Sequence, residues 1–209
     1  MTAVDPQDAI DLVDWRRRVG DLYRLRGDRA LADFRAQRDN LFRTHPQSPI
    51  PPADRPQFSG LRYFEPDPRY RFRSRFEPVA EGDLVEIDTG GEDGLIRYRR
   101  AGSVSFTLGG ADCRLTVLSL VGYGGGLFLP FRDGTSGKDT YGGGRYLFDT
   151  IKNTDGLALE LNAGSSAITI DFNFAYNPSC AYDARWACPL APRENWLPVA
   201  VRAGEKIFA

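Results

Sequence analysis

The N-terminal part of the chain has hydrophobic positions at helical spacing. Asp5-Pro6 is typical of a helix start, because Asp caps a helix and proline is tolerated in its first turn. One apolar stripe follows at Leu12, Trp15, Val19 and Leu22, and another at Leu31, Phe34, Arg38 and Leu41. Arginines and aspartates occupy the other faces. The pattern predicts two amphipathic helices with solvated outer faces.

From residue 70 the hydrophobic period changes to two. In Tyr70–Phe76 the aromatic residues alternate with Arg71, Arg73 and Arg75, an arginine row that is either a solvated strand face or an anion site. Further strand candidates follow at 84–88, 95–100, 104–108, 113–121, 127–131, 145–150, 157–161 and 167–174. Glycine-rich turns connect several of them and no long helices alternate with them. We therefore expect a mainly β fold, an antiparallel β-barrel or β-sandwich preceded by two N-terminal amphipathic helices.

Three parts of the chain follow from these patterns. We expect an N-terminal helical pair over residues 1–45, a proline-rich connector over 46–69 and an antiparallel β domain over 70–209. The connector contains Phe58, Leu61, Tyr63 and Phe64, which are too apolar for a free linker, so it should pack against the domain. His45 lies among prolines at the start of the connector, where an exposed loop is expected.

The charge balance argues against two classes of partner. The chain has 27 basic and 28 acidic residues, and nucleic-acid or membrane binding usually needs a basic surplus. We expect no nucleic acid and no membrane partner, and composition does not determine the oligomeric state. The sequence has no long apolar run and no secretory pattern at its N-terminus, so a cytoplasmic location is expected.

The scarcity of histidine restricts the chemistry further. His45 is the only histidine, which disfavours Ser-His-Asp, Cys-His and multi-histidine metal sites. Cys180 and Cys188 flank a short loop, so we expect them within disulfide range but mainly reduced in the cytoplasm. Cys113 falls in an apolar strand and should be inert. No metal ligands are assigned, and the residues do not identify a cofactor.

Polar groups lie beside glycine or proline in three separate segments. Asp133, Tyr141, Arg145, Asp171 and Asn173 are expected to line one concave pocket, with Asn177, Glu194 and Asn195 completing the candidate ligand-binding set. The glycines at 142–144 would permit close backbone approach. Strand alternation would place Asp171, Asn173 and Asn177 on one face and Phe172, Phe174 and Tyr176 on the other. Alternatively, Arg145 pairs with Asp133 or Asp171 and only orders the turns.

Several of these motifs also occur together in a known family. They are Pro130-Phe-Arg-Asp-Gly-Thr-Ser-Gly137, Thr140-Tyr141 with Gly144-Arg-Tyr-Leu147, Asp171-Phe-Asn173, Ala175-Tyr-Asn-Pro178 with Cys180-Ala-Tyr182, and Cys188-Pro189 with Glu194-Asn195. In these the chain resembles the prokaryotic family catalogued as domain of unknown function 1684. The resemblance runs from Ser48 to Lys206 and implies no particular activity.

Two functions and a neutral alternative remain open. The first is a binding module that holds a small polar or anionic ligand through Arg145, Asn173 and Asn177. The second is a hydrolase or lyase that uses Asp133, Asp171 or Glu194 as acid or base, with a divalent cation on the Asp171/Asn173 face as one variant. The third is a structural or interaction protein without a ligand. The residues leave open whether the protein is an enzyme.

Overall fold

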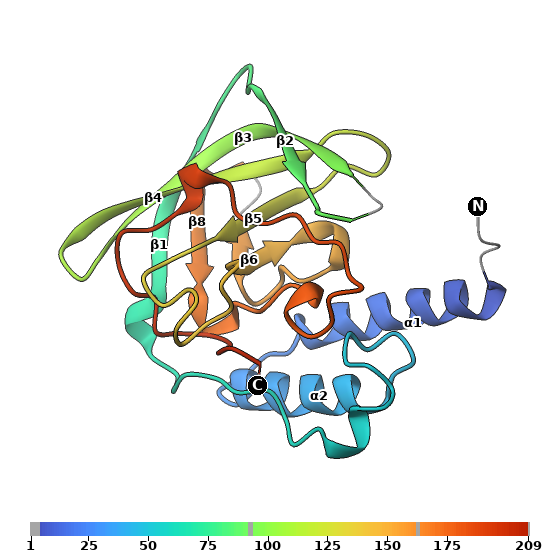
Figure 1. The fold of residues 1–209 in the computed structure, drawn as a ribbon. Helices are drawn as coiled ribbons and strands as arrows, with labels where there is room; N and C mark the ends of the chain where they lie inside the picture. The colour runs from blue at the N-terminus through green and yellow to red at the C-terminus, as the bar shows by residue number, and fades with distance from the viewer. Residues whose placement is uncertain (1–4, 92–93, 162–163, 209) are drawn as a thin grey trace.

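The computed structural model describes residues 5–91, 94–161 and 164–208 of the chain. Within these residues, two α-helices precede eight strands that form one antiparallel, nearly closed β-barrel (Figure 1). The expected fold class is confirmed, with a barrel in place of a sandwich.

The two helices begin near the predicted positions, and their apolar stripes face the barrel. Helix α1 (Pro6–Leu22) is capped by the Asp5 carboxylate, which accepts a hydrogen bond from the Gln7 backbone, and α2 is Ala30–Thr44. The inner faces bury Val19 and Leu22 of α1 and Phe34 and Leu41 of α2. These four side chains belong to the same hydrophobic cluster as the barrel strands. The helices therefore share their core with the barrel.

The eight strands form one antiparallel sheet, in which β2 lies outside the main strand order. They are β1 (Arg71–Pro78), β2 (Leu84–Asp88), β3 (Leu95–Leu108), β4 (Ala111–Leu120), β5 (Leu127–Phe131), β6 (Arg145–Asp149), β7 (Leu159–Leu161) and β8 (Ala167–Asp171). The order across the sheet is β6-β5-β4-β3-β1-β8-β7, and β2 pairs with β3. The two segments predicted at 95–100 and 104–108 are one strand, whose register with β4 shifts between Arg100 and Gly102.

Short 3-10 helices connect the larger elements. They are η1 (Arg55–Gln57), η2 (Pro68–Tyr70), η3 (Thr150–Lys152), η4 (Phe172–Phe174), η5 (Ser179–Ala181) and η6 (Arg193–Asn195). After β8 the chain continues through η4 and η5 and returns to the neighbouring strands, where Tyr176 pairs with Tyr146 of β6 and Trp196 with Arg132 directly after β5. This return brings the C-terminal segment against the strands that carry the predicted site residues.

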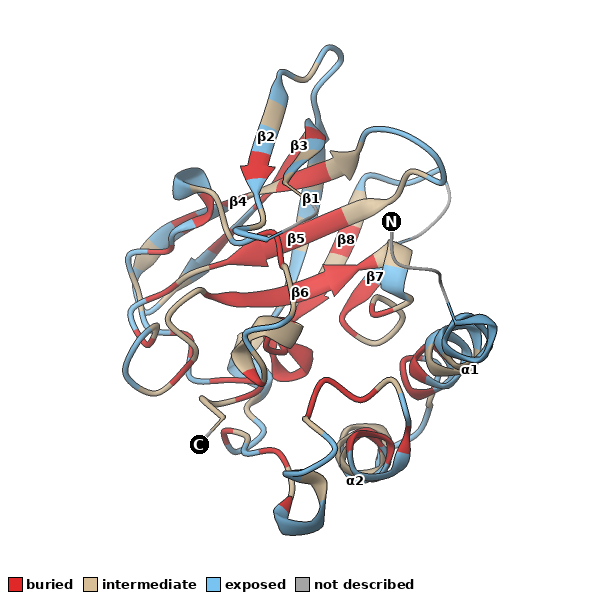
Figure 2. Cartoon of the chain, turned by 45° about the vertical axis from the view of Figure 1, so that its right-hand side comes forward, coloured by how far each residue is buried: buried red, intermediate tan, exposed pale blue. Residues whose placement is uncertain are grey.

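Aromatic side chains fill the barrel interior. The ring of Phe172 meets Phe72, Phe106 and Phe131 at centroid distances of 5.9, 5.5 and 5.1 Å. Buried residues concentrate on β5, β6 and η4, whereas β2 and the outer face of α1 are largely exposed (Figure 2). Of the predicted site residues, Arg145 lies on β6 and Asn173 in η4, within this buried part of the molecule.

Two local expectations are wrong. The alternation predicted through residue 177 stops at Asp171, because its carboxylate accepts the Asn173 N–H and starts η4. Consequently, residues on both predicted faces, including Asn173 and Phe174, are buried. His45 is also buried, since its ring packs edge-on against Trp15 and its Nε2 lies 3.1 Å from an Asp14 carboxylate oxygen.

The arginine row of β1 lies on the exposed face of the strand. Arg71 pairs with Glu160 of β7, with 2.6 Å between Nη2 and Oε1. The row thus has the geometry of a solvated strand face with at least one ion pair across the sheet.

Candidate functional site

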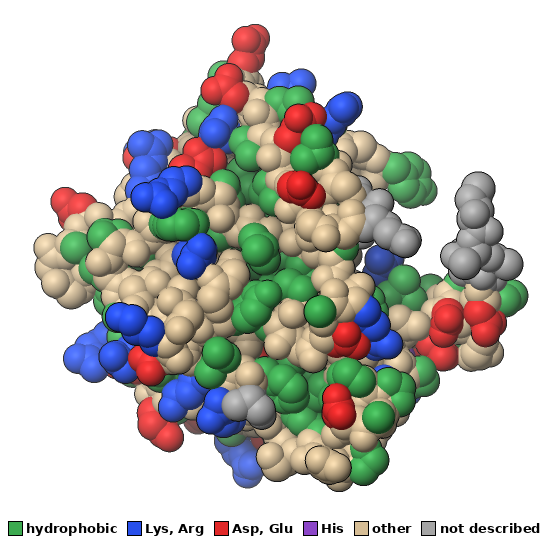
Figure 3. Space-filling model, viewed as in Figure 1, with side chains coloured by type: hydrophobic (Ala, Val, Ile, Leu, Met, Phe, Trp, Pro, Cys, Tyr) green, Lys and Arg blue, Asp and Glu red, His purple; other side chains and the backbone are tan. Residues whose placement is uncertain are grey.

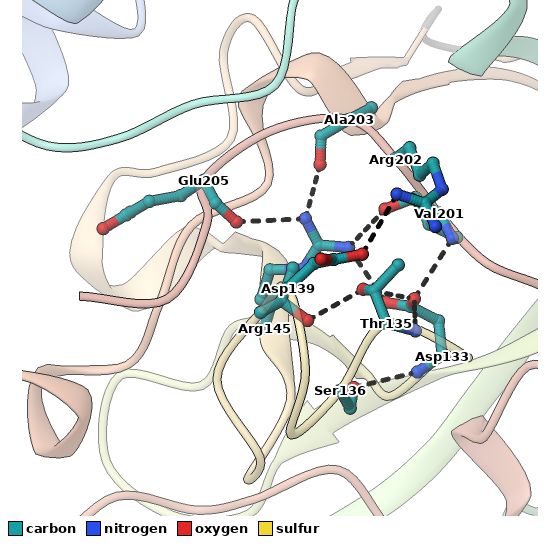
Figure 4. Close-up of polar contacts among 10 residues, drawn as sticks. Asp133, Thr135, Ser136, Asp139, Arg145, Val201, Arg202, Ala203 and Glu205 are labelled. Atoms are coloured by element: carbon teal, nitrogen blue, oxygen red, sulfur yellow. Dashed lines mark hydrogen bonds and ion pairs between the residues drawn. The ribbon is translucent and has the colours of Figure 1, made fainter. Parts of the chain in front are cut away.

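Arg145 is buried beneath the C-terminal segment. Its guanidinium lies 2.9 Å from the Asp133 carboxylate and donates to the carbonyls of Val201, Ala203 and Glu205 (Figure 4). The side chain is 1% exposed. Arg145 therefore holds β6, the turn after β5 and the C-terminal segment together, and we call this group the Arg145 clamp.

Asp133 has its hydrogen-bonding capacity filled by the protein. One carboxylate oxygen accepts from the Thr135 N–H at 2.8 Å, the Thr135 hydroxyl at 2.6 Å and the Val201 N–H at 3.1 Å. The other oxygen faces Arg145. A carboxylate that accepts from this many donors is well placed to stabilise the turn.

Asp171 and Asn173 form a second, separate group. The Asp171 carboxylate accepts from the backbone and side-chain N–H groups of Asn173, at 2.9 and 2.8 Å. Asn173 in turn exchanges two hydrogen bonds with the backbone of Asp67, which attaches the proline-rich connector to the barrel. Burial raises the pKa of Asp171, partly opposed by these hydrogen bonds from Asn173.

The remaining candidates lie at further places. Asn195 bridges β4 and β5, since its amide pairs with both backbone groups of Thr116 and donates to the Pro130 carbonyl. Glu194 lies nearer the surface and pairs with Arg100 at 3.0 Å. The Tyr141 hydroxyl points instead to Cys180, 3.6 Å from its sulfur.

These contacts divide the predicted side chains into separate hydrogen-bonded groups. Most buried polar atoms of these side chains have a local partner, as the high cost of burying an unpaired polar group requires. The three carboxylates proposed as acid or base do not meet, since Asp133, Asp171 and Glu194 have separate partners. Across the described ranges, no group of three or more His, Cys, Asp or Glu residues is arranged to hold a metal ion.

A pocket does exist at the seam between the helical pair and the barrel, which we call the seam pocket. Its wall is mainly apolar and aromatic and is formed by Trp15, Val19, Leu22, Tyr23, Arg38, Leu41, Phe42, Pro49, Tyr146, Lys152, Thr154, Tyr176, Asn177, Pro178, Ser179 and Tyr182. Asn177 is the member of the predicted ligand-binding set that lines it.

Arg38, which lines the seam pocket, belongs to a buried ion pair. Arg38 of α2 donates to the Glu205 carboxylate at 2.8 Å, and both side chains are at most 7% exposed. The Glu205 carboxylate also accepts from the Asn177 backbone and amide N–H groups, each at 3.1 Å, and from the Tyr182 hydroxyl. Arg38 additionally donates to the Tyr63 hydroxyl at 3.0 Å. The pair connects α2, the connector and the barrel.

The protonation states in this wall follow from burial and charge. Desolvation opposes the charge of Arg38, but attraction by Glu205 and nearby tyrosines raises its pKa overall, so it stays cationic. Burial raises the pKa of Tyr63 to about 12 and that of Tyr23 further still. The tyrosine hydroxyls therefore remain protonated and act as neutral hydrogen-bonding groups.

Two buried polar atoms of the pocket wall have no hydrogen-bond partner among the described residues. They are the Tyr23 hydroxyl and the Asn177 side-chain oxygen. Tyr23 and Asn177 are each 2% exposed, and both line the seam pocket. Native proteins pair nearly all buried polar groups, so these two atoms are exceptions among the residues of the pocket wall.

The sequence interpretation did not select the helix side of this site. Tyr23, Arg38 and Glu205 are far apart in the chain, and their meeting depends on how α1 and α2 dock on the barrel. One signal was present, because Arg38 occupies a position in an otherwise apolar helical stripe. A charge at such a position predicts a buried ion pair.

The surface has no dominant charge sign in the view of Figure 3, where acidic and basic side chains are distributed over the same face. None of the helices in the described parts of the chain has the length and apolarity needed to cross a bilayer.

The fold and the seam pocket define a class of protein, an antiparallel β-barrel covered by an N-terminal helical pair with a polar-edged pocket between them. The chain belongs to the family described as "Protein of unknown function (DUF1684)", whose model matches residues 56–206. The resemblance stated from the sequence motifs is confirmed.

A solved relative has a similar fold. An uncharacterised protein of Haloarcula marismortui, determined by solution NMR, is 39% identical and superposes with a TM-score of 0.62. The match covers 84% of this chain and 91% of that one. A comparison with curated proteins found no match.

Proposed function

We propose that the protein is a binding module for a small polar ligand, neutral or anionic, that occupies the seam pocket. The observation that carries the proposal is the pair of orphaned groups, the Tyr23 hydroxyl and the Asn177 side-chain oxygen. A buried polar group without a partner costs about 1–3 kcal/mol. A ligand that supplies both partners would recover part of that free energy on binding. We also propose the cytoplasm as the location of this module.

The pocket suits a ligand of modest size. The cavity volume of the pocket is about 70 Å3, and the whole hollow, including its open mouth, is about 590 Å3. One water needs roughly 10–15 Å3 of such cavity volume, so about five waters fit in the pocket. A ligand with one small ring or a short chain is of comparable size.

The charges of the wall favour a neutral or anionic ligand. Arg38 and Lys152 line the pocket, and no described Asp or Glu does. The Arg38 guanidinium also lies over the Phe42 ring at 4.5 Å, so this aromatic face is already occupied by a cation. Arg38 is paired with Glu205 and Lys152 with Asp149, and in each pair the basic partner is the one that lines the pocket.

The hydrogen-bonding groups indicate what the ligand must offer. The Asn177 oxygen accepts, so the ligand needs an O–H or N–H donor. Nη2 of Arg38 has a long contact of 3.4 Å to the Tyr182 hydroxyl, which leaves it able to donate to a ligand acceptor. A hydroxy acid or an amide combines such a donor with such an acceptor.

The experiment is a thermal-shift and ligand-observed NMR screen of the full chain with glycolate, benzoate, 4-hydroxybenzoate and benzamide. Tyr23→Phe serves as the test variant and Tyr123→Phe as the matched control, because Tyr123 is fully exposed. We expect at least one probe to bind the wild type and the control, and to bind Tyr23→Phe more weakly.

The same variant separates binding from structure. Without a ligand, Tyr23→Phe should unfold at a higher temperature than the wild type, because it removes an unpartnered hydroxyl from the interior. Equal probe affinity for the wild type and Tyr23→Phe, or no binding by any probe, would contradict the proposal. Conversion of a bound probe during the NMR measurement would instead identify an enzyme.

A further inference from the structure

Two cysteines lie against each other beside the seam pocket. Cys180 is part of η5, and its backbone N–H donates to the sulfur of Cys188 at 3.4 Å. The Tyr141 hydroxyl contacts the Cys180 sulfur from the other side, at 3.6 Å. Both cysteines are free thiols, and Cys113 is buried in β4 as a third. The structure thus brings together the two cysteines that flank the loop at 181–187.

The two thiols have different protonation preferences. Hydrogen bonding from the Cys180 thiol lowers the pKa of Cys188 to about 6, against the effect of burial. The same hydrogen bond, followed by burial, raises the pKa of Cys180. At neutral pH the pair therefore favours a thiolate at Cys188 and a thiol at Cys180. A thiolate is the nucleophilic form, and a neighbouring thiol is suited to resolve its oxidised product.

We propose that Cys180 and Cys188 are a reversible oxidation site whose oxidised form is a disulfide across the loop at 181–187. Cys188 is 3% exposed, so the oxidant must be small, and we assign that role to hydrogen peroxide. Neither cysteine is used by the seam pocket as a ligand group, so this site stands independently of the proposed function.

The reaction balances in two steps. The Cys188 thiolate attacks one peroxide oxygen, the O–O bond breaks, and hydroxide leaves, which produces a sulfenic acid at Cys188. The Cys180 sulfur then attacks the Cys188 sulfur, an S–S bond forms, and the Cys180 proton leaves with the hydroxyl as water. In sum, one thiolate and one thiol are oxidised and one peroxide is reduced to a water and a hydroxide, and the hydroxide becomes a second water by taking up the proton that Cys188 lost on ionisation. A thiol reductant reverses the process by thiol–disulfide exchange.

A consequence for the seam pocket rests on the proposed function. Pro178, Ser179 and Tyr182 line the pocket and lie directly around Cys180 in the chain. Formation of the disulfide pulls the Cys180 and Cys188 sulfurs to a bond length and so moves this part of the wall. Oxidation is therefore expected to change the affinity of the pocket for its ligand.

The test uses the reduced full chain, treated with hydrogen peroxide and digested without reductant. Mass spectrometry should find peptides linked through Cys180 and Cys188, lighter by two hydrogen atoms, and dithiothreitol should separate them. Cys113 is the internal control, because its thiol is buried away from the pair and should still be alkylated after unfolding. Cys180→Ser should accumulate a dimedone-reactive sulfenic acid at Cys188 instead of a disulfide.

Two results would overturn the proposal. One is that Cys180 and Cys188 both remain alkylatable after peroxide treatment of the wild type. The other is oxidation of Cys113 at the same rate as the pair. These thiol measurements need no ligand, so they fail or succeed separately from the binding screen. A changed probe affinity after oxidation tests the link to the pocket, and an unchanged affinity removes that link while the disulfide result stands.

Discussion

Replacing Arg145 by alanine tests whether this residue is structural. Arg145 is the centre of a clamp that joins the Asp133 carboxylate to three backbone carbonyls of the C-terminal segment. Arg145→Ala would leave the Asp133 charge buried without its cation. It would also leave the carbonyls of Val201 and Ala203 without this donor. The expected result is a large loss of stability with no specific effect on a ligand site.

The magnitude follows from the burial of both partners, each with 1% of its side chain exposed. Removing one partner of a buried ion pair costs about 3–5 kcal/mol, because the other charge is left uncompensated. A typical domain unfolds with about 5–15 kcal/mol in total. Arg145→Ala should therefore lose between about a fifth and all of the free energy of unfolding.

The assay is urea unfolding at 25 °C, followed by circular dichroism and tryptophan fluorescence. Arg202→Ala is the matched control, because Arg202 pairs with Asp139 at the surface of the same segment, where an ion pair contributes about 0–1 kcal/mol. If Arg145→Ala fails to fold, Arg145→Lys retains the charge and allows a measurement. A loss below about 1 kcal/mol for Arg145→Ala would refute the structural role argued from the clamp.

Three further outcomes are expected. Burial raises the pKa of Asp149 in the folded protein. The contribution of this carboxyl group to stability is therefore present below its unfolded pKa near 4 and is lost as pH rises through its folded pKa. Asp149→Asn should be more stable than the wild type at pH 7, and its urea midpoint should change less between pH 4 and pH 7. In a double-mutant cycle, the double variant Arg38→Met/Glu205→Gln should lose about 1.5–3 kcal/mol less stability than the two single variants lose when their losses are added. Additive losses would contradict the pairing. Asn195→Ala should lose about 1–3 kcal/mol in the same assay, since it leaves the strand groups that it bridges unpartnered, and an unchanged midpoint would argue against the bridge.

The sequence pattern predicts the larger elements well because their burial is periodic. The helical stripes identify α1 and α2, and the alternation from residue 70 identifies β1. The β5 prediction at 127–131 agrees with the structure at both ends. Antiparallel pairing follows from short connections, whereas barrel closure depends on how far the sheet curls, and no single residue encodes that.

The candidate site was harder to predict because the same residue types serve both structure and function. Asp133 and Arg145 do pair, which was one of two partners considered for Arg145. Nothing in the chain indicates that the C-terminal carbonyls complete the guanidinium's hydrogen bonds, since they lie more than 50 residues away. His45 shows the same limit, because proline punctuation locates a loop but does not report that Trp15 covers it.

Glu205 shows how the clamp and the seam pocket depend on one another. Its backbone carbonyl accepts from Arg145, while its side chain accepts from Arg38. The adjacent Gly204 has a φ of +74°, and a Cβ at this position would lie 2.5 Å from the Ala175 carbonyl oxygen. The C-terminal segment therefore requires glycine next to Glu205. Of the carboxylates that first suggest catalysis, Asp133 is thus occupied in holding the barrel and the C-terminal segment together. Ligand chemistry is better sought at neutral groups that this framework leaves unpaired, and Tyr23 and Asn177 are such groups in the seam pocket.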